Sequence, residues 1–140
     1  MAEATTQLVE LDRDECLRLL AATRFGRVAF SVEGWAPVIR PVNYLFDESS
    51  QSVVFRSEAG IEAHGALLSA QAAFEIDEID PAGETGWSVI VIGVVDEVTQ
   101  PAEVRRLEQS GLRTLAPGER PHWLRIRATT VSGRRIVSST

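Results

Sequence analysis

Apolar and polar residues alternate with a period of two in several short runs, as they do in β-strands with one buried face. Three such runs follow one another at residues 27–32, 38–46 and 52–57. Their connections are short, which predicts an antiparallel meander. Pro41 lies inside the second run and Pro37 just before it. Since proline has no N–H for a strand ladder, we expect this strand at a sheet edge or with a bulge.

Three further strands are predicted over residues 70–80, 87–98 and 122–131. The fifth strand, "WSVIVIGVVDEV", departs from the alternation, because Val89 and Ile90 begin two apolar sets on opposite faces. A strand that is apolar on both faces needs cover on both. The interior of a small barrel covers one face, and a helix or a second subunit must cover the other. This strand therefore indicates a homodimer.

Few helices interrupt these strands. The run "LDRDECLRLLAA" predicts a helix whose start carries a capping box, Asp12 followed by Glu15. A second short helix is predicted over residues 100–111, and a third near Ile61. The expected fold class is therefore all-β or mainly β. We predict an antiparallel barrel, closed or partly open, with six strands and two or three short helices.

Length and composition fit one globular domain, with 140 residues of which 44% are hydrophobic. We assign this domain to residues 11–137, after a flexible N-terminus at residues 1–10 that frays or lies on the surface. The net charge of −6 argues against nucleic-acid binding. No signal peptide and no membrane span is recognisable, so a cytoplasmic protein without membrane partners is expected. The single cysteine, Cys16, falls on the apolar face of the first helix and is expected to be buried.

The usual catalytic and metal-binding patterns are absent. His64 and His122 lack metal-ligand spacing and are interpreted as structural or solvated, so neither a metal nor a catalytic residue is predicted. One stretch, "VVFRSEAGIEAHGALL", has the residue types of a phosphate-binding site at a junction of strand, turn and helix. Such junctions are also common without a ligand. The stretch predicts a strand that ends in Arg56 and Ser57, a turn at Gly60, and a helix N-terminus. Guanidinium, hydroxyl and backbone N–H donors would meet there.

Four segments resemble the pyridoxamine 5′-phosphate oxidase-like family of FMN-binding split barrels, in its small bacterial members. They are "GRVAFSVEGWAPVIRPVNYLFDESSQSVVFRSEAG", "AAFEIDEID", "GWSVIVIGVVDEV" and "HWLRIRATTVSGRRI". Their order and spacing match over residues 8–136. The resemblance implies a six-stranded split barrel that forms a homodimer, with FMN in a groove between the subunits. It also implies an oxidoreductase of unknown substrate, in which the flavin carries the hydride or electron chemistry.

The resemblance further implies which residues bind the cofactor. They are Pro41, Val42, Asn43, Phe55, Arg56, Ser57, Gly60, Glu62, Trp87 and Ser88. In this family the segment "FR[ST]xxGxK" holds the phosphate, which makes Arg56 and Ser57 the phosphate contacts. The segment around Asn43 would run along the flavin ring. The segment that opens with Trp87 would approach from the partner subunit.

Glu62 departs from the family pattern, which has Lys at this position. A carboxylate there would repel a bound phosphate, by about 3–4 kcal/mol at a separation of ~4–6 Å and an effective dielectric near 20. FMN binding is therefore expected to be weak, or the ligand is different. The alternatives are a deazaflavin-dependent oxidoreductase, a non-catalytic carrier or sensor, and a ligand-free dimeric split barrel. The carrier would bind a flavin, a deazaflavin, or haem with His64 as an axial ligand.

Oxidation of pyridoxamine phosphate itself is not expected. The chain is short, and the family's substrate-phosphate residues are not recognisable near the C-terminus. Four arginines in that region would bind an anion or, as we prefer, pair with surface carboxylates. They are Arg125, Arg127, Arg134 and Arg135.

Overall fold

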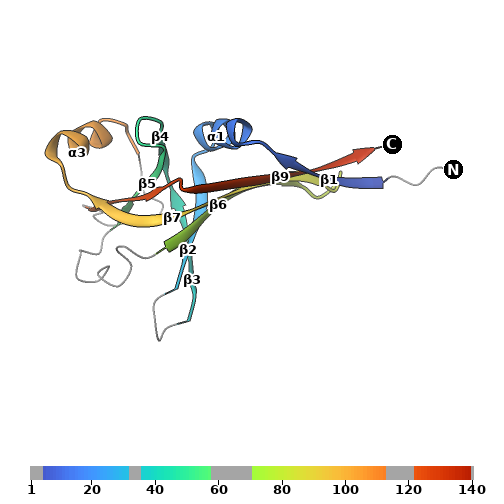
Figure 1. The fold of residues 1–140 in the computed structure, drawn as a ribbon, viewed down its shortest axis with the longest axis horizontal. Coiled ribbons are helices and arrows are strands. Elements are labelled where there is room, and N and C mark those ends of the chain that lie inside the picture. Colours follow the sequence, from blue (N-terminus) through green and yellow to red (C-terminus); the bar gives the residue numbers. More distant parts are fainter. Residues whose placement is uncertain (1–4, 32–35, 58–70, 113–121, 140) are drawn as a thin grey trace.

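The computed structural model describes residues 5–31, 36–57, 71–112 and 122–139. Antiparallel strands dominate this part of the chain, and two helices pack against them (Figure 1). In chain order the elements are β1 (Thr5–Leu11), α1 (Arg13–Ala22), β2 (Phe25–Phe30), β3 (Val38–Asn43), β4 (Leu45–Asp47), β5 (Ser52–Ser57), β6 (Gln71–Asp80), β7 (Thr85–Val98), α3 (Pro101–Glu108), β8 (His122–Arg127) and β9 (Thr130–Ser139). The mainly β fold class predicted from the alternation is confirmed.

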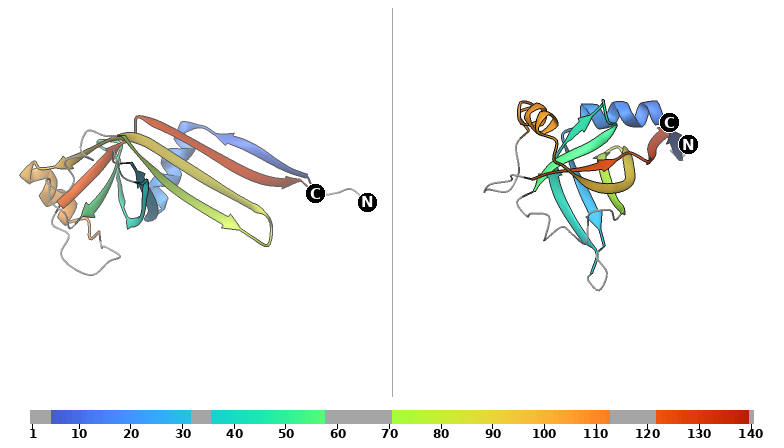
Figure 2. Two further views of the ribbon diagram at one scale, coloured as in Figure 1. Left: turned by 90° about the horizontal axis from the view of Figure 1, so that it is seen from below. Right: turned by 60° about the vertical axis from the view of Figure 1, so that its left-hand side comes forward.

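Strand β7 organises the sheet, because it has three partners. Along one side it pairs with β6, while along the other it pairs first with β9 and then with β8. The two partners on that side diverge at Gly93, where a Cβ atom would lie 1.7 Å from the carbonyl oxygen of Arg127. The strand order β3-β2-β6-β7-β8-β5-β4 curls into a half-barrel (Figure 2). This is the split barrel that the resemblance implies.

The main core lies between the curled sheet and α1. Phe74, Val89 and Ile126 are fully buried there. Cys16 is also fully buried, as predicted, and packs from α1 into the same cluster. The carboxylate of Asp12 accepts a hydrogen bond of 2.8 Å from the backbone N–H of its predicted capping partner, so the helix begins where the sequence indicates.

Helix α3 covers a second, smaller cluster on the other face of β5 and β8. This cluster contains Val54, Val98, Leu107 and Trp123. Arg106 on α3 donates to both carboxylate oxygens of Asp47, at 3.2 Å each, which ties the helix to the end of β4. Within the described residues, neither helix has the length and apolar character needed to cross a membrane.

The strands differ from the predicted six in three places. The second predicted strand divides into β3 and β4 at Tyr44, which is buried and donates a hydrogen bond of 2.6 Å to the carbonyl oxygen of Leu20. The sixth divides into β8 and β9. The N-terminal residues were expected to fray or to lie on the surface. They form β1, which lies on the surface and pairs with β9 over seven residues. Since β1 is held by backbone hydrogen bonds and its side chains are exposed, it lacks the alternation that reveals a half-buried strand.

Candidate functional site

One face of the sheet points away from the main core, and we call it the outer face. Strand register aligns its residues in rows that cross β3, β2, β6, β7 and β9. One row is almost wholly apolar and contains Ile39, Ala29, Ala73, Ile92 and Thr130. The next row contains Pro41, Arg27, Glu75, Ile90 and Ser132. The outer face is therefore a broad surface with an apolar centre.

Exposed large hydrophobic side chains gather on this face. In the described part of the chain there are nine, and register places all of them on the outer face except Val9. The others are Leu8, Phe25, Ile39, Ile79, Ile90, Ile92, Val94 and Ile136. Strand β7 is apolar on both faces, as predicted: Val89 and Val91 are buried, whereas Ile90 and Ile92 each stay 38% exposed. An apolar patch of this kind is typical of a contact surface.

The residues predicted to run along a flavin ring lie at the edge of the outer face. Pro41 and Asn43 on β3 face outward, while the side chain of Val42 packs against the main core. Ser88 on β7 belongs to the same outer face. Three strand spacings separate β3 from β7, or about 14 Å, so both segments border one continuous surface.

The predicted phosphate segment lies at the end of β5. Its side chains alternate as predicted, because Phe55 is buried in the main core and Arg56 faces the opposite side. The guanidinium carbon of Arg56 lies 5.0 Å from the centre of the Trp123 ring, a cation–π distance. Ser57 lies directly opposite His122 on β8. Three other predicted site residues, Gly60, Glu62 and His64, lie outside the described residues.

A single chain does not bring all the predicted segments together. Asn43 and Arg56 are near each other, since each lies two residues from the cross-strand pair of Leu45 and Val54. The Trp87 segment is remote from them. Arg56 pairs with Trp123 on β8, and Trp123 pairs in turn with Val98, at the opposite end of β7 from Trp87. Eleven residues of β7 separate that end from Trp87, or about 36 Å of strand. Within one chain, the Trp87 segment and the phosphate segment therefore belong to opposite ends of β7.

Comparison with known proteins shows the family. The family model for pyridoxamine 5′-phosphate oxidase matches residues 12–135. This chain belongs to the pyridoxamine 5′-phosphate oxidase family. An uncharacterized protein of Mycobacterium tuberculosis is 38% identical over 112 residues, which are 76% of this chain and 72% of that protein.

Two solved structures are similar over nearly their whole length. The FAD-binding protein from Mycobacterium smegmatis is 31% identical, with a TM-score of 0.71, and the match covers 90% of this chain and 95% of that one. A FAD-binding protein from Mesorhizobium loti is 25% identical, with a TM-score of 0.72, over 91% of this chain and 97% of the other. The family's split barrel therefore extends over nearly the whole chain.

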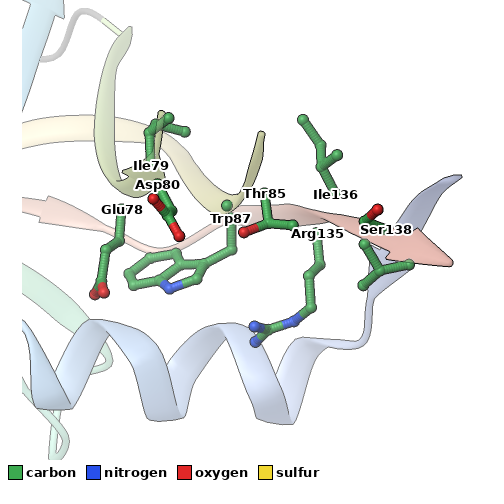
Figure 3. A pocket seen from close by; sticks show the side chains of 10 residues that line it. Glu78, Ile79, Asp80, Thr85, Trp87, Arg135, Ile136 and Ser138 are labelled. Atoms are coloured by element: carbon green, nitrogen blue, oxygen red, sulfur yellow. The ribbon is translucent and has the colours of Figure 1, made fainter. Parts of the chain in front are cut away.

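Trp87 lines a pocket of about 470 Å³ on the face opposite Ser88. Figure 3 shows its indole, Glu78 and Arg135 pointing toward α1, while Ile79 and Ile136 point away. The ten residues that line the pocket are Glu78, Ile79, Asp80, Thr85, Gly86, Trp87, Arg135, Ile136, Val137 and Ser138. Of these, Trp87 is a site residue expected from the family resemblance, and Arg135 is one of the arginines considered as an anion ligand. The others come from strands that meet only through the register of β6, β7 and β9.

A charged group interrupts the apolar surface. Arg27 on β2 lies 3.3 Å from a carboxylate oxygen of Glu75 and 3.6 Å from one of Asp77. Burial raises the pKa of Glu75 above its ordinary value, and the neighbouring Asp77 raises it further, whereas Arg27 opposes the rise. One guanidinium thus pairs with two carboxylates and neutralises only part of their charge.

Most of the C-terminal arginines pair with carboxylates, as preferred from the sequence. Arg125 bonds Asp96 at 2.9 Å and also lies 3.0 Å from Glu103, and Arg127 lies 3.5 Å from Asp96. Arg135 lies 3.4 Å from Glu15 on α1. Arg134 lies opposite Ser88 of β7 and Glu10 of β1. These pairs fasten strands and helices to one another.

Proposed function

We propose that two copies of this chain pair through their outer faces and bind a flavin nucleotide between them. The pair would act as an oxidoreductase on a substrate that is not identified. The observation that carries the proposal is the exposed apolar surface on β7 and its neighbours, bordered by the predicted ring segments around Asn43 and Ser88. An uncovered surface of this kind is typical of a subunit contact.

The described residues fit a flat, phosphate-tailed group. Pro41 and Asn43 would lie along the ring, with Ser88 contributed by the partner copy. Arg56 and Ser57 would hold the phosphate, where an arginine fork suits phosphate oxygens. Phe55 would support this segment from inside the core. When bound, the flavin supplies hydride or electron transfer, and the chain's part is to orient the ring and exclude water.

FMN is the flavin that the resemblance implies. FAD is a second candidate, and the observation that favours it is that the two solved relatives described above are FAD-binding proteins. The two cofactors share the ring and the first phosphate. The same surface and the same Arg56 would therefore serve either, and the choice between them depends on what lies beyond that phosphate.

Purified protein mixed with FMN, FAD or riboflavin tests the proposal. We expect a visible flavin spectrum or quenching of flavin fluorescence on addition, and a solution mass of two chains. Arg56→Gln should weaken FMN binding and leave riboflavin binding unchanged, since riboflavin has no phosphate. A protein that is monomeric and binds none of the three would contradict the proposal, and a Soret band would point to haem instead.

A further inference from the structure

The carboxylate of Glu97 lies at one end of the barrel, and one of its two oxygens lacks a hydrogen-bond donor among the described residues. Its Oε1 atom is buried, and no donor in the described part of the chain reaches that atom with hydrogen-bond geometry. A buried carboxylate is costly unless a positive charge compensates it. The basic group beside it is His122, whose Nδ1 atom is 3.5 Å from Oε1. An imidazolium at His122 would compensate the charge of Glu97.

His122 also faces the proposed phosphate segment. Strand β8 lies between β5 and β7, and His122 pairs directly with Ser57 on β5. Side chains of directly opposite residues begin about 4.5–5.5 Å apart. His122 is therefore the direct cross-strand neighbour of Ser57. Glu97 belongs to the second strand away, whose backbone is about 10 Å from that of Ser57.

We infer that His122 is a phosphate-binding residue of the flavin nucleotide site, with Glu97 as the residue that positions its ring. The inference rests on the proposed function and places a cation on the Ser57 side of the phosphate segment, while Arg56 would reach the same phosphate from the other face of β5. Because Nδ1 faces Glu97, the other ring nitrogen, Nε2, is the one left for the ligand. From the sequence, this histidine was expected to be structural or solvated, since nothing in one sequence pairs it with Ser57.

Charge and distance decide the sign of the effect. Because β8 lies between β5 and β7, an imidazolium at His122 would lie nearer an anion at Ser57 than the Glu97 carboxylate does, and Coulomb energy falls with distance. Of the charged groups that register places around His122 in the described residues, Glu97 shares its face of the sheet. Arg56 is adjacent, but its guanidinium lies over Trp123 on the opposite face. Helix α3 packs on that opposite face as well.

Phosphate binding should therefore depend on pH. Histidine side chains in general change charge between about pH 5 and pH 8. The phosphate of a nucleotide gains negative charge over the same range, around pH 6, which on its own would strengthen binding as the pH rises. A preference for phosphate that weakens with rising pH is thus the signature of a histidine cation.

FMN and riboflavin are suitable probes, because the phosphate is the only difference between them. Their dissociation constants would be measured on the full chain from about pH 5.5 to about pH 8.5, on either side of the range in which histidines titrate. For the unaltered protein, the preference for FMN over riboflavin should fall by at least about tenfold across this range. His122→Gln should make the preference low and nearly independent of pH. His122→Lys should keep the preference and remove most of its pH dependence.

Arg18→Gln is a matched control, because it also removes one positive charge and lies exposed on α1. It should behave as the unaltered protein does. If His122→Gln does not fold, the comparison between the unaltered protein and His122→Lys decides the question. An unaltered pH dependence in either His122 variant, or no preference for FMN at acid pH in the unaltered protein, would overturn the inference while leaving flavin binding intact. Binding of neither probe at any pH would contradict the proposed function itself.

Discussion

Ile92→Asp should separate the two copies of the proposed dimer. Ile92 lies on β7 within the apolar row of the outer face, between Ala73 on β6 and Thr130 on β9. Its side chain is 38% exposed in one chain, so part of its apolar surface is still available for burial by a partner. A carboxylate at this position remains hydrated in a monomer, but it would be buried without a cation in the dimer.

The magnitude follows from the exposed fraction. Full burial of an isoleucine side chain contributes about 1.5–3 kcal/mol, so the 38% still exposed corresponds to about 0.6–1.1 kcal/mol for each chain. Each dimer contains two copies, and Ile92→Ala should therefore weaken association by about 1–2 kcal/mol. Ile92→Asp adds the desolvation of two carboxylates at several kcal/mol each, and the dimer dissociation constant should rise by at least about a thousandfold.

Sedimentation equilibrium of the two variants measures this directly. Val9→Asp is the matched control, because Val9 is 40% exposed and, alone among the exposed large hydrophobic residues in the described part of the chain, lies on the opposite face. It should leave the dimer intact. Circular dichroism checks that each variant keeps its strands, since a polar residue at an exposed strand position costs no more than about 1 kcal/mol. A fully dimeric Ile92→Asp protein, or equal dissociation by Val9→Asp, would refute the assignment of the outer face.

Three further predictions concern the ligand and the fold. Glu62→Lys should raise FMN affinity by at least about tenfold and leave riboflavin affinity unchanged, and titration of both flavins checks it; equal affinities before and after would place residue 62 away from the phosphate. Burial alone would raise the pKa of Asp47, but hydrogen bonds from Ser50, Arg106 and Ser49 outweigh it and hold that pKa below its ordinary value. The resulting stability is present above the unfolded-state pKa and is lost as the pH falls through the folded-state value. Asp47→Asn should therefore lower the free energy of unfolding at neutral pH by about 1–3 kcal/mol. Urea titrations at several pH values should also show that the free energy of unfolding of this variant decreases less on acidification than that of the unaltered protein. Gly93→Ala should cost about 3 kcal/mol or more, because its Cβ would overlap the backbone of Arg127, whereas Gly83→Ala meets only the Asp80 side chain at 3.0 Å and should stay within about 1 kcal/mol; similar melting temperatures for the two variants would contradict this.

Alternation along each strand was enough to predict the faces of the sheet. It predicted that Leu124 points inward, and Leu124 is buried in the main core. Its absence along residues 87–98 indicated that β7 is apolar on both faces, as the structure shows. Alternation failed for β1, because exposed side chains carry no alternating pattern, and for the break at Tyr44, because a buried tyrosine hydroxyl bonded to Leu20 depends on a distant helix.

The candidate site was less accessible to sequence reasoning. Which residues of two distant strands lie opposite one another depends on the register of the pairing. A single sequence does not specify that register. The contact between His122 and Glu97, and the opposition of His122 to Ser57, both depend on such pairing. The same limit applies to the pocket at Trp87, which exists only where β6, β7 and β9 meet. Family resemblance supplied the phosphate segment, and the strand register then placed the Trp87 segment far from it within one chain.

The central claim is that a flavin nucleotide binds between two copies joined through their outer faces. Sedimentation equilibrium in the presence of FMN or FAD, recorded at the visible absorbance of the flavin, tests it most directly. The flavin should sediment with a particle of twice 15.3 kDa. Ile92→Asp should abolish both the dimer and the visible absorbance of flavin that sediments with the protein. Flavin that sediments with single chains, or that stays bound to a monomeric Ile92→Asp protein, would contradict it.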